Sequence, residues 1–296
     1  MSANDHYVAI DAVVNLWTRE ALSVRPDWKD EFFSGKMRAK DSLMSGMTLD
    51  QMIERMAAAN IGHGFLVAAK AGRVGLPGCY HMPPQVVADA VAAAPKKFSG
   101  LIGIDPFTGM DGVRELEHAV RELGFIGAHS YPHWFDLPPD HAKYYPFYAK
   151  CVELGVPVQI QVGQSMIYSK QHRTRSTGRP IALDAIACDF PELKLIGIHV
   201  GIPWADEMIA MAWKHENVFI VCDAHSPKYW PPSFVQYMNT YGHKKVLFGT
   251  DFPVLDFERT VDEIDALALR DASRRAVMRD NVIRVYGLDP SIGQPT

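Results

Sequence analysis

Short runs of valine, isoleucine and other apolar residues recur eight times along the chain, and an amphipathic stretch follows most of them. A short apolar run is typical of a buried β-strand, and a longer amphipathic stretch is typical of a helix that covers a sheet. Their regular alternation indicates βα units, which build a parallel sheet with helices on the outside. This repeated pattern predicts an α/β fold.

The apolar runs predict eight strands, and the amphipathic stretches predict a helix after each of them. Thr48 is expected to cap the first helix, because Gln51 stands three residues further on as in a capping box. The expected strands span residues 7–14, 64–68, 100–104, 125–129, 157–162, 193–199, 218–222 and 245–248. The expected helices span residues 48–59, 83–94, 113–124, 144–155, 181–188, 204–214, 233–241 and 258–269, and a terminal helix spans 272–288.

Eight strand–helix pairs favour a (β/α)₈ TIM barrel, which needs about 250 residues in one domain. The rival fold is a doubly wound open sheet, which usually has fewer strands and a glycine-rich phosphate turn after the first one. No G-x-G-x-x-G sequence follows any of the expected strands. We therefore predict a single barrel domain over residues 1–296.

One loop of this predicted barrel is unusually long. Residues 17–46 separate the first strand from its helix, whereas an ordinary βα loop has about 2–6 residues. The insertion follows the carboxyl end of a strand, which is the catalytic face of such barrels. We expect it to fold over the mouth of the barrel as a lid and to help select the substrate.

The charge and composition of the chain give no indication that it binds nucleic acid or a membrane. The formal net charge is −4, which gives no electrostatic case for nucleic acid or an anionic membrane surface. No apolar run approaches the roughly 18 residues of a membrane span, and the first residues lack the pattern of a signal peptide. The 4 cysteines are scattered without a C-x-x-C pair, which indicates reduced residues. We expect a cytoplasmic protein.

Polar and titratable residues gather where the predicted strands end. A single residue of this kind at a strand end is more often a helix cap or a core residue with its hydrogen bonds satisfied. Here, however, such residues follow at least five different strands. Active sites of such barrels lie at the carboxyl ends of the strands, so their joint placement predicts a catalytic mouth. The residues expected there are Asn15, His129, Tyr131, His133, Gln159, Gln161, His199, Asp223, His225 and Asp251.

A family resemblance rests on the last third of the chain. Residues 190–207 read FPELKLIGIHVGIPWADE. They are followed in order by KHENVFIVCDA, by KVLFGTDFP at residues 245–253, and by RDNVIRVYGL. This succession resembles the amidohydrolase superfamily, and within it the amidohydrolase-related enzymes similar to aminocarboxymuconate semialdehyde decarboxylase. The resemblance extends from Ile10 to Leu288 and implies a barrel like that of the metal-dependent hydrolases. It also implies that His199 and Asp251 are catalytic.

The chain departs from the family at the metal ligands that the resemblance implies. The family pattern at the first strand is D-x-H-x-H, whose two histidines bind a divalent metal, but Val13 and Asn15 stand at these positions. Gln161 stands where the family places a third metal histidine. Valine and an amide are poor substitutes for imidazole on zinc. We therefore expect no tightly bound metal, and we expect any weakly bound divalent ion such as Zn²⁺ to use His199 and Asp251.

A relocated metal site is the alternative to this expectation. Asp223 and His225 share one side of their strand, because side chains alternate along a strand. Whether candidate ligands from four strands converge depends on loop geometry, so the alternative stays open at this point. These ligands are His129, His199, Asp223, His225 and Asp251.

Without a metal, a retained histidine and aspartate predict acid–base chemistry. The carboxylate of Asp251 would orient the imidazole of His199, and the ring would move a proton. An activated lactone is easier for such a pair to hydrolyse than an amide, because no metal polarises the carbonyl group. By resemblance, the pyrone-dicarboxylate lactonases of the family are a precedent for hydrolysis without a metal. We predict a metal-independent hydrolase of a carboxylated conjugated or aromatic compound. A decarboxylase of an aromatic or vinylogous acid and a catalytically silent ligand-binding barrel remain alternatives.

Substrate-binding residues are expected on the same face of the barrel. Arg173 and Arg175 lie in the loop after the fifth strand and suit a carboxylate, although a solvated basic loop or a subunit contact is equally consistent. Aromatic residues such as Trp17 suit a planar acid, with packing beneath the loops as the alternative. We expect a small carboxylate as partner, no nucleic acid and no membrane, and the resemblance implies a homo-oligomer. The expected substrate-binding residues are Asn15, Trp17, His129, Tyr131, His133, Gln161, Arg173, Arg175 and His225.

Overall fold

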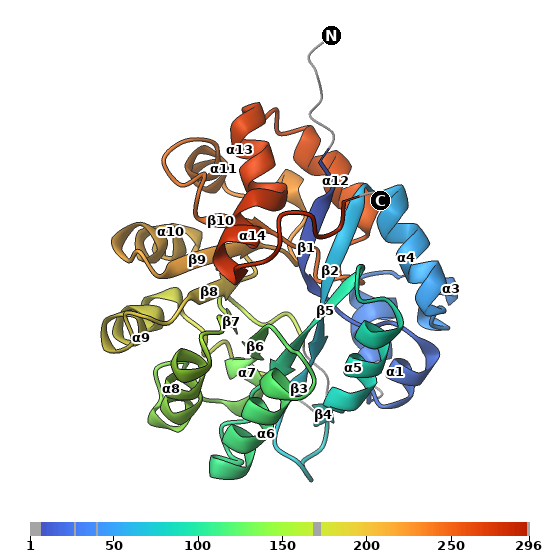
Figure 1. Cartoon of the computed structure of the whole chain (residues 1–296), viewed down its shortest axis with the longest axis vertical. Coiled ribbons are helices and arrows are strands. Elements are labelled where there is room, and N and C mark those ends of the chain that lie inside the picture. The colour runs from blue at the N-terminus through green and yellow to red at the C-terminus, as the bar shows by residue number, and fades with distance from the viewer. Residues whose placement is uncertain (1–6, 27, 40, 168–172, 295–296) are drawn as a thin grey trace.

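The computed structural model describes residues 7–26, 28–39, 41–167 and 173–294. Its main sheet has eight parallel strands, and the sheet closes almost completely on itself (Figure 1). The closing contact is a parallel bridge between Val14 and Phe252. The predicted barrel is therefore confirmed. In order around the barrel, the strands are β1 (Ala9–Val14), β2 (Ile61–Ala68), β5 (Phe98–Gly103), β6 (Gly127–Ser130), β7 (Val158–Gln161), β8 (Leu195–Ile198), β9 (Val218–Cys222) and β10 (Val246–Phe248).

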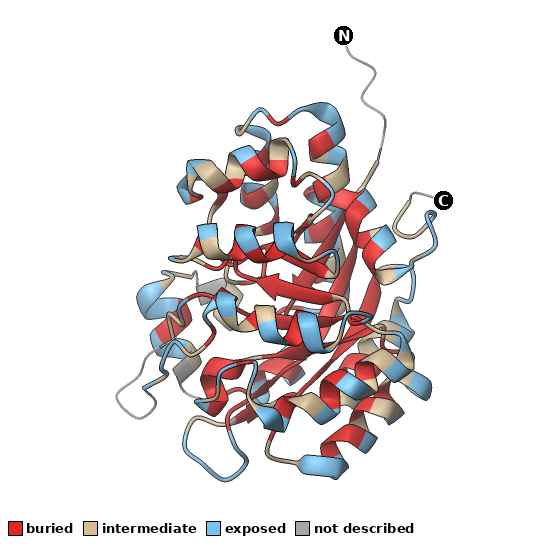
Figure 2. Cartoon of the chain, turned by 90° about the vertical axis from the view of Figure 1, so that its left-hand side faces the viewer, coloured by how far each residue is buried: buried red, intermediate tan, exposed pale blue. Residues whose placement is uncertain are grey.

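Helices form the outer ring of the barrel (Figure 1). The eight barrel strands are buried throughout, whereas the helices show an alternation of buried and exposed residues (Figure 2). Among the described residues, no helix combines the length and apolar character needed to cross a membrane. The outer helices are α4 (Leu49–Ala58), α5 (Pro84–Ala93), α6 (Gly109–Arg121), α8 (Tyr145–Leu154), α9 (Leu183–Asp189), α10 (Ala205–Lys214), α11 (Pro232–Asn239) and α12 (Phe257–Asp265).

Local sequence signals explain where several of these helices begin and end. Thr48 and Gln51 form the predicted capping box of α4, since the Thr48 hydroxyl accepts from the Gln51 N–H and the Gln51 side chain accepts from the Thr48 N–H. Gly155 ends α8 in the left-handed conformation, with φ of 67°, which glycine adopts without steric cost.

The structure also contains elements that the sequence patterns did not predict. A two-stranded hairpin, β3 (Lys70–Ala71) and β4 (Tyr80–His81), follows β2. Strands of two residues are too short to show an alternating pattern. The terminal helix is divided into α13 (Asp271–Arg275), a π-helical turn (Ala276–Asp280) and α14 (Asn281–Tyr286).

The long insertion after β1 is helical and is fixed to the barrel by Trp17. The Trp17 side chain is fully buried, its indole N–H donates to the carbonyl of Leu43 at 2.8 Å, and its ring contacts Phe33. These contacts join Trp17, at the start of the insertion, to Phe33 and Leu43 further along it. Its elements are α1 (Arg19–Ser23), α2 (Trp28–Asp30), a π-helical segment (Glu31–Lys36) and α3 (Asp41–Met44).

Candidate active site

Three titratable side chains converge beyond the carboxyl ends of β8, β9 and β10. The Nε2 atom of His199 lies 3.5 Å from Oδ2 of Asp223 and 3.6 Å from Oδ2 of Asp251. One ligand atom from each residue lies within 4.8 Å of the others. All three residues are buried. We call these residues the His199–Asp223–Asp251 cluster.

The backbone at this cluster adopts conformations that are rare outside glycine. His199, Ala224 and Asp251 have φ values of 71°, 59° and 54°, which place them in the left-handed region. Hydrogen bonds hold these turns: the His199 N–H donates to Oδ1 of Asp223 at 2.5 Å, and the Asp251 N–H donates to the Val13 carbonyl at 2.9 Å. Strained backbone of this kind concentrates at functional sites.

Two amide side chains stand at positions of the lost metal histidines and contact the cluster directly. The Asn15 Nδ2 group donates to Oδ1 of Asp251 at 2.8 Å, and the Gln161 Nε2 group lies 3.2 Å from Nδ1 of His199. The closing of the barrel brings Asn15 to Asp251, since the Asn15 N–H also donates to the Phe252 carbonyl. Each amide therefore orients one member of the cluster.

Burial sets the charge state of the cluster. Desolvation raises the pKa of Asp223, and the nearby charge of Asp251 raises it further. Desolvation also raises the pKa of Asp251, although the Asn15 hydrogen bond opposes this. Burial lowers the pKa of His199 well below its ordinary value, and charge on His225 adds to the effect. Two adjacent buried carboxylates therefore need a positive charge between them to ionise together.

The donor set of the cluster fits a divalent cation. His199 Nε2 and Asp223 Oδ2 are buried and have no hydrogen-bond partner within the part of the chain that the structure describes. Imidazole nitrogen and carboxylate oxygen are ligands that manganese and zinc accept. A cation held by His199, Asp223 and Asp251 would compensate both carboxylates and satisfy these atoms.

A cavity opens onto the cluster and contains one buried cation from the insertion. Arg25 lines this cavity with an exposed fraction of only 7%. Its guanidinium lies 4.7 Å from the ring centroids of both Trp17 and Tyr80, and Nη2 donates to Oδ1 of Asn15 at 3.1 Å. The other polar lining residues include Asn15, Tyr80, Tyr131, Gln161, His199, His225 and Asp251, and the apolar wall includes Phe32, Phe33, Trp134, Met166, Ile167 and Val254.

Three of the expected substrate-binding residues lie away from the cavity surface. His129 is fully buried, with Nδ1 bonded to Oε1 of Gln159, and burial lowers its pKa to about 4. His133 is also buried, and its Nδ1 accepts from the N–H groups of Thr177 and Gly178. Trp17 anchors the insertion as described above. These positions support the site but do not line it.

The arginines expected to bind a carboxylate are also placed elsewhere. Arg175 pairs with Asp136 at the surface, where 79% of the Arg175 side chain is exposed. Arg173 is exposed too. A surface guanidinium that is already paired gains little from a further anion, because water screens both charges. Asn15, Tyr131, Gln161, His199, His225 and Asp251 do line the cavity.

Arg25 was not predicted, whereas Asp223 was expected at the catalytic mouth and as a ligand of the relocated metal site. Nothing in the sequence around Arg25 distinguishes it from other arginines, because its burial arises from the fold of the insertion. Asp223 follows β9 directly, so its position at a strand end was the available signal.

Comparisons with known proteins give consistent matches. The sequence model of the amidohydrolase family matches residues 10–288. The chain is 29% identical to a 2-keto-4-carboxy-3-hexenedioate hydratase of Sphingobium sp., covering 68% of this chain and 69% of the relative. It is 24% identical to a gamma-resorcylate decarboxylase of Rhodococcus jostii, covering 69% of this chain and 75% of the relative.

A solved structure corrects the prediction about the cofactor. The 5-carboxyvanillate decarboxylase of Novosphingobium aromaticivorans has the same fold, with a TM-score of 0.71, 18% identity, and coverage of 97% of this chain and 98% of its own. It was crystallised with manganese and 4-hydroxy-3-methoxy-5-nitrobenzoic acid. The expectation of no metal cofactor is wrong: it rested on the substituted ligand positions of the family, whereas His199, Asp223 and Asp251, three of the residues considered for a relocated site, lie together.

Proposed function

The chain belongs to the amidohydrolase family of enzymes, and we propose that it is a divalent-metal-dependent decarboxylase of a small aromatic carboxylic acid. The observation that carries this proposal is the buried guanidinium of Arg25 in an aromatic cavity beside the His199–Asp223–Asp251 cluster. Relatives named as decarboxylases of aromatic acids support the reaction class.

His199, Asp223 and Asp251 would hold the metal, through one nitrogen and two carboxylate oxygens. Manganese or zinc in such a site supplies a Lewis acid that binds and orients an oxygen of the substrate. Gln161 holds the ring of His199 through Nδ1, which leaves Nε2 directed at the two carboxylates. An amide offers both a donor and an acceptor, so Gln161 serves either tautomer of this ring.

Arg25 would bind the substrate's carboxylate. A guanidinium pairs with a carboxylate through two parallel hydrogen bonds, and this pairing is strong where water is excluded. Arg25 has one described hydrogen bond, to Asn15, and its Nε atom has no partner among the described residues. The guanidinium therefore retains donors for a ligand. Phe32 and Phe33, from the same insertion, supply apolar surface for an aromatic ring.

Decarboxylation exchanges a carboxylate for a proton on the same carbon. The proton adds to the ring carbon, the bond to the carboxylate carbon breaks, its electron pair restores the ring and carbon dioxide leaves. We assign transfer of this proton to Asp251, whose carboxylate would first take it from a water molecule at the mouth of the cavity, because this carboxyl lines the cavity whereas that of Asp223 does not. The apolar wall keeps bulk water away from the ring, so the ring carbon takes its proton from the enzyme.

Addition of water to a conjugated carboxylated acid is the second candidate. The hydratase relative has the higher identity of the two relatives described above. His225 lines the cavity, and an imidazole there would take a proton from an attacking water and pass it to the neighbouring carbon of the double bond. The same cavity and the same Arg25 would bind the carboxylate in this reaction.

The test measures carbon dioxide release and product formation with manganese present, using hydroxybenzoates and conjugated carboxylated acids. Arg25→Met should raise KM about 10- to 100-fold, the loss expected for a hydrogen bond to a charged group. Arg175→Met is the matched control and should change KM less than twofold, because Arg175 is exposed and paired. The amide analogue of the substrate should bind the wild type and Arg25→Met equally weakly.

The outcomes separate the proposals. Release of carbon dioxide in proportion to product supports decarboxylation, and a hydrated product without it supports the second candidate. Neither product from any acid, or a larger effect of Arg175→Met than of Arg25→Met, would reject the proposed use of this cavity.

A further inference from the structure

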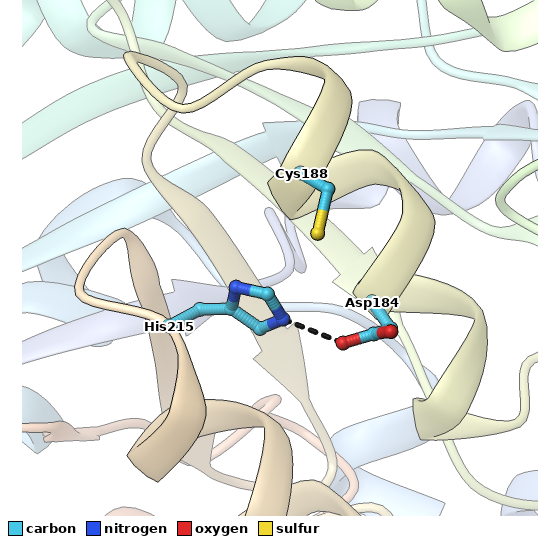
Figure 3. Close-up of side chains that lie close together, drawn as sticks. All are labelled: Asp184, Cys188 and His215. Carbon is cyan, nitrogen blue, oxygen red and sulfur yellow. Dashed lines mark hydrogen bonds and ion pairs between the residues drawn. The ribbon is translucent and has the colours of Figure 1, made fainter.

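A second cluster of metal-ligating side chains lies on the outside of the barrel, on helix α9 and directly after the end of α10. Asp184, Cys188 and His215 place a carboxylate oxygen, a thiol sulfur and an imidazole nitrogen within 4.8 Å of one another (Figure 3). We propose that these three residues form a binding site for a zinc-class divalent cation, separate from the active site. Thiolate, imidazole and carboxylate are the protein ligands that zinc uses.

The local structure brings the three ligands together. Asp184 and Cys188 are four residues apart on α9, so they lie on the same face of that helix, one turn from each other. His215 follows the last residue of α10 and reaches across to them (Figure 3). Its Nε2 atom lies 2.6 Å from Oδ1 of Asp184. A cation bound here would join the ends of two neighbouring helices.

His215 is held in place without a metal. Only 10% of its side chain is exposed. Its backbone N–H donates to the Met211 carbonyl at 3.1 Å, and its own carbonyl accepts from Nζ of Lys245 at 2.8 Å. Ligands that are already oriented lose little conformational entropy when they bind an ion. Cys188 is exposed, which leaves room for solvent to complete the coordination.

Lys214 competes with a cation for the same oxygen. Its Nζ atom lies 2.6 Å from Oδ1 of Asp184, while 54% of the Lys214 side chain is exposed. An exposed pair of this kind contributes little stability, typically about 0.2–1 kcal/mol. The lysine can therefore move into solvent when a divalent ion binds, at a small cost. This competition predicts that removing the ammonium strengthens metal binding.

The experiment uses Co²⁺ as a spectroscopic probe and Zn²⁺ in competition with a chromophoric chelator. The His199–Asp223–Asp251 cluster contains no sulfur, so a thiolate-to-cobalt charge-transfer band reports only on the outer site. We expect this band in the wild type to saturate with one Co²⁺ at the outer site, in addition to the ion held by the His199–Asp223–Asp251 cluster. Cys188→Ala should abolish it, and His215→Gln should weaken binding by at least about tenfold. Cys79→Ala, at the other partly exposed cysteine, should leave it unchanged.

Lys214→Met should strengthen metal binding, whereas the ligand variants should weaken it, so it is the sharper test. It should tighten Zn²⁺ binding about two- to fivefold, which corresponds to the loss of the competing surface ion pair. A gain in affinity does not arise from misfolding. Absence of the thiolate band in the wild type, its survival in Cys188→Ala, or weaker binding in Lys214→Met would overturn the proposal.

Discussion

Asn15 donates a hydrogen bond from Nδ2 to Oδ1 of Asp251 across the seam where the barrel closes, at 2.8 Å. The Oδ1 atom of the same amide accepts from Nη2 of Arg25 at 3.1 Å. A reversed amide would oppose donor to donor and acceptor to acceptor, so the two neighbours fix its orientation. Asn15 therefore connects the buried guanidinium to the His199–Asp223–Asp251 cluster. It does so at a position where the family resemblance implied a metal histidine.

Removal of the metal should abolish activity. Protein grown with manganese or zinc is expected to hold one ion at the His199–Asp223–Asp251 cluster, and a chelator followed by added Mn²⁺ should remove and restore turnover. Asp223→Asn should lower metal affinity at least about tenfold, because it withdraws one charged ligand. Plasma mass spectrometry and calorimetry measure this in the Cys188→Ala background, which removes the outer site. Full turnover by metal-free protein would contradict the prediction.

Asn15→Leu should separate the substrate site from the cluster. Leucine has nearly the same shape but leaves Oδ1 of Asp251 without its donor and Arg25 without its acceptor. We expect kcat to fall about 10- to 100-fold, as for other residues that orient metal ligands, and KM to rise as Arg25 moves. Steady-state kinetics measure both effects, and circular dichroism checks the fold. An unchanged kcat would show that Asp251 keeps its position without Asn15.

The sequence was sufficient to predict the barrel because short runs of mainly apolar residues, each followed by an amphipathic stretch, recur eight times along the chain. The predicted range 218–222 is the observed β9, and Thr48 caps α4 as expected. The hairpin β3–β4 was missed, although Tyr80 of β4 lines the cavity. Two-residue strands pair because of their neighbours, and no local pattern encodes that pairing.

The site was harder to predict because it depends on how distant segments meet. His199 and Asp251 were expected from the strand ends, and the structure brings them within 3.6 Å of each other. Arg25 was missed since its burial results from the insertion folding back over Trp17. A tightly bound metal was not expected because the family's histidine positions at the first and fifth barrel strands are substituted, yet Asp223, directly after β9, completes a set of ligands with His199 and Asp251.

Asp251→Asn, which removes the proposed proton-transfer group, should lower kcat about 10²–10⁴-fold, and His199→Ala, which removes a metal ligand, should lower it by a similar factor. Both residues belong to one cluster, so the double variant should be little worse than the more impaired single variant. Steady-state kinetics with saturating Mn²⁺ measure kcat for the wild type, the two single variants and the double variant. Near-wild-type turnover in both single variants would place the reacting group elsewhere, and full additivity would show that the two residues act independently.

Acid should destabilise the fold through buried His63, which lies outside the active site in β2. The ring is fully buried between Oγ of Ser99 and the Lys96 carbonyl, and burial lowers its pKa from 6.5 to about 4. Between pH 6.5 and about 4, His63 is protonated in the unfolded chain but neutral in the folded protein. The contribution of neutral His63 to the free energy of unfolding is therefore complete above pH 6.5 and is lost as the pH falls. The loss reaches about 3 kcal/mol near pH 4. Urea unfolding across this range should show a shallower slope of unfolding free energy against pH in His63→Asn than in the wild type. The exposed His118→Gln control should keep the wild-type slope, and an equal slope in His63→Asn would show that His63 does not carry this effect.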